Sequence, residues 1–535
     1  MKLPELSPSA QPEFVDPASA KAWLDNVPLA NVGNAQAEML EQLHEFNRFP
    51  TASANRLAVM EMLREAVNFV QVEHAKRFMN RALPMAKAEA EVFEDTVDLW
   101  EEMRLGYARC LDAAANGDAG MRAQAALLAQ RAIAYSGLKM FHHARAYRQV
   151  TRSDWAALHR AYAEAETLEV ADEPVKDFLN RDVQDSSPGI AYARALLMAL
   201  ANPNELSQRQ LTFVAYLHER WGNKLDIERE PVAEEEGTAP LVVDLAGDAP
   251  PSRGAGNKAR EPRYLGTAKL AKSLRNRVAL LRKGESPAKL ALGEDCVQPS
   301  CEQLLIFLFR QWCQGRVERA SPRRSGSSEA RLTPEIAAAH YYLSGRAFAQ
   351  PGEQKELSKK EREEIATFGR VSTRHEDDYS QAKGFTLERW QTEDESAQGL
   401  RLVRRAGEAG RRYIHGQLVA VQPSGARNFV LGQIRWLMVA ENGDLQAGVR
   451  LLPGLPAATA ARATGLNVQN EKYVPALSLT AVAALDAPPS LVLPLGWFKP
   501  GRVIEVYVDS PVRVRLTALA DRGTDFERVA YEILP

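Results

Sequence analysis

The stretch FVLGQIRWLMVAENGDLQAGVRLL, from Phe429 to Leu452, carries the clearest structural signal in the chain. Its two apolar runs are rich in β-branched and aromatic residues, which favour strands. Between the runs lies Asn442-Gly443, the dipeptide that most strongly favours a tight hairpin turn. The stretch is therefore predicted to form an antiparallel hairpin.

The same character extends to both sides of this hairpin. GQLVAV precedes it at 416–421, and SLVLPLGWFKPGRVIEVYV and VRVRLTAL follow at 490–508 and 512–519. The C-terminal third is thus predicted to be mostly β. We expect an antiparallel β-barrel over 351–465, and over 466–535 a further β extension or a second small barrel.

The first half of the chain reads as helices in series. Val59, Leu63, Val67 and Val70 recur at three- and four-residue steps, which places them on one face of a helix. Such alanine-rich helices each have one apolar stripe to bury, so the all-α region 1–226 is predicted to be a bundle or solenoid-like domain. The expected helices lie at 35–48, 54–80, 85–116, 119–137, 153–168, 188–201 and 207–220.

Two regions separate the helical domain from the β region. Residues 227–262 are interrupted by Glu, Gly and Pro and read as a linker, in which Leu241 to Leu245 is the one possible strand. Residues 263–350 read as a second helical unit. A break at Ser321–Glu329 divides it and leads into the helix-like TPEIAAAHYYLSG.

Composition narrows the class of protein. The 535 residues are 45% hydrophobic and 25% charged, as in soluble globular proteins, and the net charge of −2 argues against a nucleic-acid binder. No signal peptide is visible at the N-terminus, and apolar runs such as Leu304–Phe309 are too short to span a membrane. A cytoplasmic protein is expected. The four cysteines lack zinc-site spacing, so reduced thiols and no metal are predicted.

Two short motifs stand at the start of the β region. Arg370-Val-Ser-Thr-Arg374 is an RxxxR pattern, which is weak alone because Arg401 and Arg405 repeat it. Asp394-Glu-Ser396-Ala-Gln-Gly399 is a DxSxxG pattern and occurs once. Either motif alone fits a surface loop or a turn whose side chains bond the local backbone. Their order and the nineteen residues between Arg374 and Asp394 make the pair more specific.

This pair resembles the motifs of the PilZ family of bacterial cyclic-di-GMP receptors, over about residues 365–460. That family places RxxxR just before a six-stranded barrel and [D/N]xSxxG on the adjoining strands. GQIRWL at Gly432–Leu437 and AGVRLL at Ala447–Leu452 resemble two later strands of the family. The resemblance implies a PilZ-like β-barrel that binds cyclic di-GMP through Arg370, Arg374, Asp394, Ser396 and Gly399.

The residue types suit such a ligand. Arg presents a planar fork of donors that fits phosphate oxygens or the O6/N7 edge of guanine, and it stacks on bases. Asp394 can accept hydrogen bonds from guanine N1–H and N2–H₂. Ser396 lies two residues along the strand and so shares its face. Gly399, without a Cβ, permits a tight bend or the close approach of a ligand.

The remaining candidates favour structural roles. His142-His143 is expected to be structural, and Trp436, Trp497 and Phe498 are expected in barrel cores, whereas Trp390 could cap the barrel or lie beside the ligand. No catalytic motif appears in its required context, so we predict a non-enzymatic signal-transduction receptor without a cofactor. Its helical region would contact a protein partner. The alternative is a protein-interaction scaffold with a degenerate barrel that binds no nucleotide.

Overall fold

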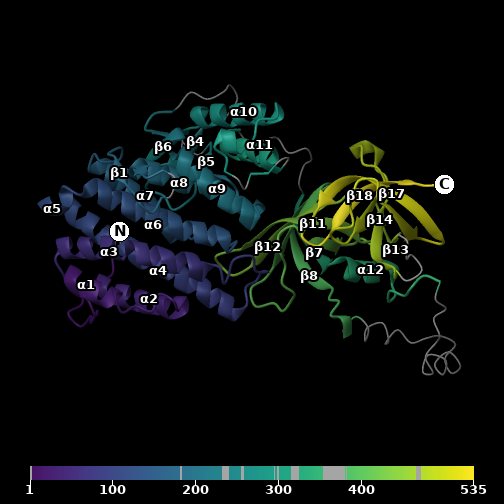
Figure 1. Ribbon diagram of the computed structural model, residues 1–535, viewed down its shortest axis with the longest axis horizontal. Helices are drawn as coiled ribbons and strands as arrows, with labels where there is room; N and C mark the ends of the chain where they lie inside the picture. Colours follow the sequence, from purple (N-terminus) through teal and green to yellow (C-terminus); the bar gives the residue numbers. More distant parts are fainter. Residues whose placement is uncertain are drawn as a thin grey trace. The chain divides into compact units, whose positions relative to one another are not determined.

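The protein is described here by a computed structural model that divides into two compact units, Met1–Arg81 with Met85–Glu318, and Ala82–Pro84 with Arg319–Pro535 (Figure 1). The residues that the structure describes are 3–180, 183–231, 240–254, 258–293, 296–297, 300–314, 324–352, 380, 382–464 and 471–535.

The first unit is built mainly of helices, as the sequence predicts (Figure 1). Helix α6 packs along α4 on one side and α8 on the other, and the stacked rings of Tyr107 and Tyr135 lie between α4 and α6. The helices are α1 (Pro17–Leu24), α2 (Val32–Arg48), α3 (Ser53–Ala75), α4 (Lys87–Ala115), α5 (Ala119–Arg122), α6 (Ala125–Arg145), α7 (Arg152–Thr167), α8 (Pro188–Leu200), α9 (Gln208–Trp221), α10 (Ala268–Arg282) and α11 (Ser300–Trp312).

Helix α6 continues past residue 137, where the sequence predicts its end. Gly137 lies inside the helix rather than at its terminus. A Cβ added there would lie 3.6 Å from Cβ of Ala195 on α8. The glycine thus lies where two helix backbones approach closely, and this packing compensates for its low helix propensity.

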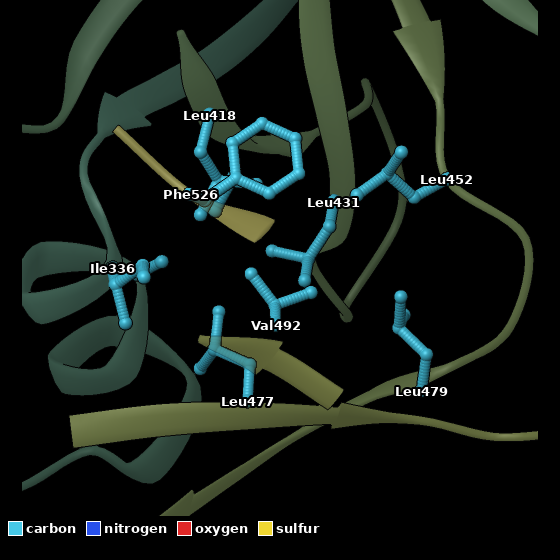
Figure 2. Close-up of a cluster of buried hydrophobic side chains, with 10 residues drawn as sticks. Ile336, Leu418, Leu431, Leu452, Leu477, Leu479, Val492 and Phe526 are labelled. Carbon is cyan, nitrogen blue, oxygen red and sulfur yellow. The ribbon is translucent and has the colours of Figure 1, made fainter. Parts of the chain in front are cut away.

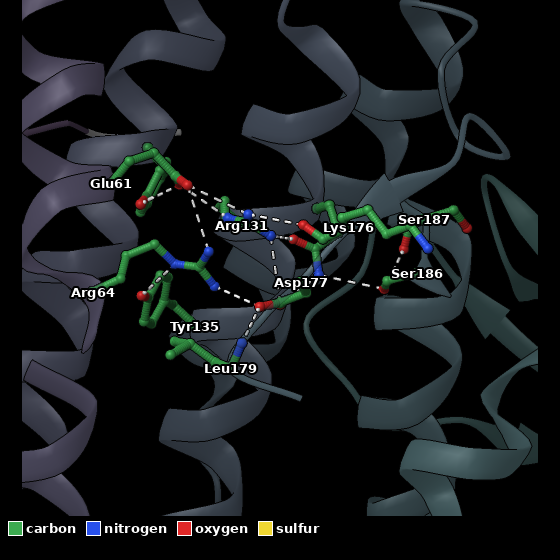
Figure 3. Close-up of polar contacts among 11 residues, drawn as sticks. Glu61, Arg64, Arg131, Tyr135, Lys176, Asp177, Leu179, Ser186 and Ser187 are labelled. Atoms are coloured by element: carbon green, nitrogen blue, oxygen red, sulfur yellow. Dashed lines mark hydrogen bonds and ion pairs between the residues drawn. The ribbon is translucent and has the colours of Figure 1, made fainter. Parts of the chain in front are cut away.

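A buried network of charges links three parts of the first unit (Figure 3). Asp177 lies between the short paired strands β1 (Val175–Lys176) and β2 (Asp185–Ser186). Its Oδ1 accepts from Arg64 of α3 at 2.6 Å, and its Oδ2 lies 3.5 Å from Arg131 of α6. Arg131, 2% exposed, also donates to Glu61 at 3.0 Å. Burial raises the pKa of Asp177, but the two arginines outweigh it and lower the pKa overall.

Removing one member of this network should lower the stability of the fold, because the remaining charges would lie unpaired in a low-dielectric interior. We expect Asp177→Ala to lower the free energy of unfolding by about 3–5 kcal/mol. Urea titration followed by circular dichroism at 222 nm would measure it. The control Asp172→Ala, at an exposed carboxylate nearby, should change stability by less than about 0.5 kcal/mol. An equal effect of the two variants would contradict a stabilising network.

The predicted linker at 227–262 differs from what the structure contains. A four-stranded sheet in the order β3-β6-β4-β5 lies there, formed by β3 (Asp226–Glu228), β4 (Leu241–Asp244), β5 (Ser252–Arg253) and β6 (Pro262–Gly266). Val242 and Val243 are buried, and the Asp244 carboxylate accepts from the backbone N–H groups of Ala246, Arg260 and Glu261. The strands are too short to show alternation, so only Leu241–Leu245 was visible in the sequence.

The second unit contains a first closed barrel with antiparallel strands in the order β10-β11-β12-β9-β8-β7. Its strands are β7 (Arg324–Pro334), β8 (Glu388–Ser396), β9 (Gly399–Arg404), β10 (Leu418–Gln422), β11 (Val430–Val439) and β12 (Leu445–Leu451). The Asn442-Gly443 hairpin joins β11 to β12, where Val439 pairs with Leu445. Gly443 has φ +85°, a value that the Asn-Gly turn requires.

Strand β7 lies outside the predicted barrel range, in the segment expected to belong to a second helical unit. Ala330 and Leu332 are buried while Glu329 and Arg331 are exposed, so the strand does alternate. Its Gly- and Ser-rich start hid this pattern. The predicted helix after it is present as α12 (Ile336–Ser344).

A second closed barrel follows, in the strand order β13-β14-β15-β18-β17-β16. The region 466–535 is therefore part of a barrel that also includes the strand before it. Its strands are β13 (Pro456–Ala463), β14 (Val474–Leu479), β15 (Ser490–Leu493), β16 (Val503–Tyr507), β17 (Pro511–Arg522) and β18 (Glu527–Ile533).

The two barrels and α12 share one hydrophobic core (Figure 2). Apolar side chains of β10 and β11 in the first barrel point toward those of β14 and β15 in the second, and Phe526 lies among them (Figure 2). The ten buried members are Ile336, Ala339, Leu418, Ala420, Leu431, Leu452, Leu477, Leu479, Val492 and Phe526.

The turn between β17 and β18 adds polar contacts to this core. Asp525 Oδ1 accepts from the backbone N–H of Leu418 at 2.9 Å, and Thr524 N–H donates to Gly416 O at 3.1 Å. Among the described residues, Asp525 Oδ2 has no hydrogen-bond partner although it is buried. Burial raises the pKa of Asp525 to about 6.

This pKa predicts a pH-dependent stability. Below about pH 4 the carboxyl is protonated in both folded and unfolded chains and costs nothing, whereas above pH 6 the folded chain holds a poorly solvated carboxylate. Asp525→Asn should therefore be more stable than the wild type by about 2 kcal/mol at pH 7, and this advantage should vanish toward pH 4. Thermal melts of both proteins at several pH values would measure the difference. A difference independent of pH would contradict it.

Within the described ranges, no helix has the length and hydropathy to cross a membrane. Cys296 and Cys301 form a disulfide with Cα atoms 5.0 Å apart, in contrast to the reduced thiols predicted. Cys110 is a buried free thiol.

Candidate functional site

The DxSxxG motif forms the hairpin between β8 and β9. Asp394 and Ser396 end β8, Gly399 begins β9, and Ser396 pairs with Gly399 across a two-residue turn. Ser396 Oγ donates to Gly399 O at 3.3 Å and accepts from Gln398 N–H at 3.4 Å. Ser396 therefore has the local turn contacts that the sequence left open as an alternative to ligand binding.

A β-bulge turns Asp394 and Ser396 to the outside of the barrel. Thr392 pairs with Leu402 and Asp394 pairs with Arg401, so Glu393 is the extra residue. Thr392 and Leu402 are buried, which places them inside. Asp394, next to the bulge, shares the opposite face with Arg401.

A row of side chains crosses the outer face from Asp394. Arg401 pairs with Gly448 of β12, which pairs with Trp436 of β11. The guanidinium of Arg401 lies 5.9 Å from the Trp436 ring centroid, 2.9 Å from Glu393 Oε2, and donates to Gln446 Oε1 at 2.9 Å. We call Asp394, Ser396, Arg401 and Trp436 the outer row. It combines a carboxylate, a hydroxyl, a cation and an indole on one surface.

The prediction of Trp436 in the barrel core is wrong. Ala447 and Val449 flank its pairing partner Gly448 on β12, and both point inward and are buried. Trp436 is instead half-buried over Gly448 on the outer face. A Cβ on Gly448 would lie 1.9 Å from Trp436 Nε1, so only glycine leaves room for the ring. Trp497 and Phe498 are partly buried against the core of the second barrel.

Trp390 lies inside the first barrel with 2% exposure. Its ring meets Tyr413 edge-on at 5.4 Å, and the Arg404 guanidinium lies 5.3 Å from its centroid. Arg404 is itself buried and donates to Glu388 at 2.8 Å. The structure therefore places Trp390 in the barrel interior and not on the outer row.

Gly399 has a structural role independent of any ligand. A Cβ at this position would lie 2.7 Å from the carbonyl oxygen of Val449 on β12. The close backbone approach at Gly399 is therefore that of a neighbouring strand. Arg370 and Arg374 lie outside the described residues.

Arg401 was not among the candidate site residues predicted from the sequence. It was noted only as part of a chance RxxxR pattern with Arg405, yet it lies two residues after Gly399 and therefore on the same face. Arg405 lines a hollow of about 750 Å³ beside β7, β8 and β9, together with Arg389, Gln391 and Glu408. Arg405 is held there by Asp444 at 2.7 Å.

The two histidines of α6 are buried and contact other side chains of the helical unit. His142 Nδ1 accepts from Trp100 Nε1–H at 3.1 Å, and His143 Nε2 lies 3.7 Å from Asp154 Oδ2. Burial lowers the pKa of each to about 4. The described part of the chain contains no cluster of three or more His, Cys, Asp or Glu side chains that could hold a metal ion.

The fold defines a class of protein in which a helical unit is followed by two closed barrels. The first barrel carries a charged and aromatic outer row. Two family models match its ends. The model described as "Cyclic-di-GMP receptor FimW, N-terminal domain" matches residues 18–232, and "FimW C-terminal beta-barrel domain" matches residues 459–534. The second match coincides with the second closed barrel.

The chain is also similar to one curated protein, the Cyclic-di-GMP receptor FimW of Pseudomonas aeruginosa. The two are 24% identical in an alignment of 541 residues that covers 92% of this chain and 86% of that protein. The matching models are thus FimW domains rather than PilZ. Neither model spans β7 to β12, so the PilZ resemblance of the first barrel stays a prediction.

The contact between Gly448 and Trp436 can be tested by a double-mutant cycle. Gly448→Ala should displace the indole and lower stability by about 1–3 kcal/mol, because overpacking forces the ring from its position. In a Trp436→Ala background the same change should cost much less. Thermal melts of the four proteins give the coupling energy. A cost of Gly448→Ala that is equal in both backgrounds would contradict this geometry.

Proposed function

We propose that this protein is a non-enzymatic receptor for cyclic di-GMP whose nucleotide site is the outer row of the first barrel. The observation that carries the proposal is the similarity, over 92% of the chain, to a protein named as a cyclic-di-GMP receptor. The outward direction of Asp394 and Ser396 supports the position of the site, since a buried pair would be inaccessible to a ligand.

The outer row supplies groups that match the ligand. Asp394 accepts from the N1–H and N2–H₂ edge of one guanine, which discriminates it from adenine. The base stacks beside Arg401 and Trp436, as guanidinium and indole planes favour. Ser396 adds a hydroxyl contact, and Gly399 keeps the hairpin close to β12. Arg370 and Arg374 bind phosphates or the second guanine through their planar donor forks.

Binding then serves signal transduction rather than catalysis. A ligand that binds one conformation more tightly than another shifts the equilibrium between them by the difference in binding free energy. A receptor therefore needs no chemical step. In this proposal the bound nucleotide alters how the barrel and the helical region are arranged, or how the helical region meets a protein partner. The receptor acts in the cytoplasm, where the nucleotide is a second messenger.

Isothermal titration of the full chain with cyclic di-GMP tests the proposal, with GTP and cyclic di-AMP as control ligands. Saturable binding of cyclic di-GMP alone is expected. Asp394→Ala should weaken it at least tenfold and Arg370→Ala should abolish it, with thermal stability unchanged. The matched control Arg389→Ala removes an exposed cation at the other end of β8, 3.8 Å from Glu329, and should bind within twofold of the wild type.

The alternative, a scaffold whose barrel binds no nucleotide, predicts a different result. It expects no heat and no thermal shift at high cyclic-di-GMP concentration in any variant. Binding that survives both Asp394→Ala and Arg370→Ala would keep the receptor function but place its site away from the outer row.

A further inference from the structure

The helical unit contains a cavity that the proposed nucleotide site does not use. Its volume is about 520 Å³, within the range of small-molecule sites. Residues of α3, α6, α8 and α9 and the segment after β1 surround it. The charged part of the lining consists of Arg64, Asp177, Arg194 and Glu219. The polar part consists of Asn68, Gln130, Tyr135, Asn180, Thr212, Tyr216 and His218.

One end of the cavity is a rigid polar floor. Arg64 donates through Nη2 to Asp177 at 2.6 Å and through Nε to Tyr135 Oη at 3.2 Å (Figure 3). Gln130 donates to the other oxygen of Asp177 at 3.0 Å. The buried network therefore fixes these side chains, and their charges balance within it.

Three further polar atoms in the lining are unpartnered. In the part of the chain that the structure describes, Arg194 Nε, Asn180 Nδ2 and His218 Nδ1 are buried without a hydrogen-bond partner. Arg194 is only 9% exposed, and its Nη2 donates to the backbone carbonyl of Glu219 at 2.8 Å. A buried guanidinium held by a carbonyl, with Nε still unbonded, favours an incoming anion.

The position of Arg194 is fixed by packing. A Cβ at Gly222 would lie 2.9 Å from Arg194 Cγ, so the stem of the arginine lies tightly against the backbone after α9. Burial lowers the pKa of this guanidinium, and the carboxylates of Glu219 and Asp177 offset that effect only in part. Burial and the Arg194 charge lower the pKa of His218 to about 3, so its imidazole is neutral and offers one donor.

The apolar part of the lining is built from small residues beside larger ones. Ala134, Gly137, Ala191 and Ala195 are the small residues of α6 and α8 that line the cavity. Leu138, Phe141 and Met198 also line the cavity. This combination of an apolar wall and buried donors suits a ligand with an apolar body and one acidic group.

We propose that this cavity, with Arg194 and Asn180 as donors, binds a small amphipathic carboxylate. The carboxylate accepts from Arg194 Nε and Asn180 Nδ2, and the apolar body lies along Ala195, Phe141 and Met198. The site belongs to the helical unit alone, so it is separate from the nucleotide site proposed on the first barrel.

Isothermal titration of the full chain with 2-naphthoate tests this site. We expect saturable binding with one molecule per chain. Arg194→Gln keeps a long side chain but removes the cation, and it should weaken binding at least tenfold. Ala195→Phe fills the cavity and should abolish binding. The matched controls Arg152→Gln and Ala54→Phe change exposed residues of α7 and α3 outside the lining and should bind like the wild type.

Neutral 2-naphthalenemethanol, titrated in parallel, should bind the wild type at least tenfold more weakly than naphthoate does. Because it carries no charge, it should bind Arg194→Gln with the same affinity as the wild type. Thermal melts accompany each titration, and if Ala195→Phe fails to fold, Arg194→Gln decides. Absence of naphthoate binding at millimolar concentration would overturn the proposal. So would binding that is unchanged in a folded Arg194→Gln protein.

Discussion

The second unit depends on an apolar stripe on the outside of its first barrel. A closed barrel buries its inner side chains by itself. Leu418, Ala420 and Leu431 point outward, so another part of the protein must pack on them to bury them. The second barrel provides that cover with Leu477 and Phe526 (Figure 2). Burial of this stripe joins the two barrels through one core. It also leaves the outer row, on β8, β9 and β11, as a polar part of the first barrel's exterior.

Much of the architecture was accessible from the sequence. The Asn442-Gly443 turn, the helical periodicity around Val59 and the change to strand patterning all correspond to elements of the structure. The missed elements were short or atypical. Strand β7 begins with Gly and Ser, and the strands near Val242 are too brief for alternation to be read. Pairing partners distant in sequence stabilise them, and a local pattern does not record such partners.

The candidate site was predictable by residue type but only partly by geometry. Asp394 and Ser396 lie on one face, as a spacing of two requires. Arg401 was dismissed because its motif recurs by chance, and Trp436 was placed in the core because aromatic residues usually fill barrels. Cross-strand register decides both positions, since Arg401 and Trp436 meet through Gly448 on a strand between them.

The bulge at Glu393 has a consequence for how such motifs are inherited. Trp390 and Asp394 are four residues apart, and in a regular strand both would face the same way. Here Trp390 fills the interior while Asp394 faces solvent, because one extra residue reverses the parity between them. In a homologous barrel without that residue, the same letters D-x-S would point into the core. Two chains with identical motifs can therefore present them on opposite faces of the strand, depending on whether the extra residue is present.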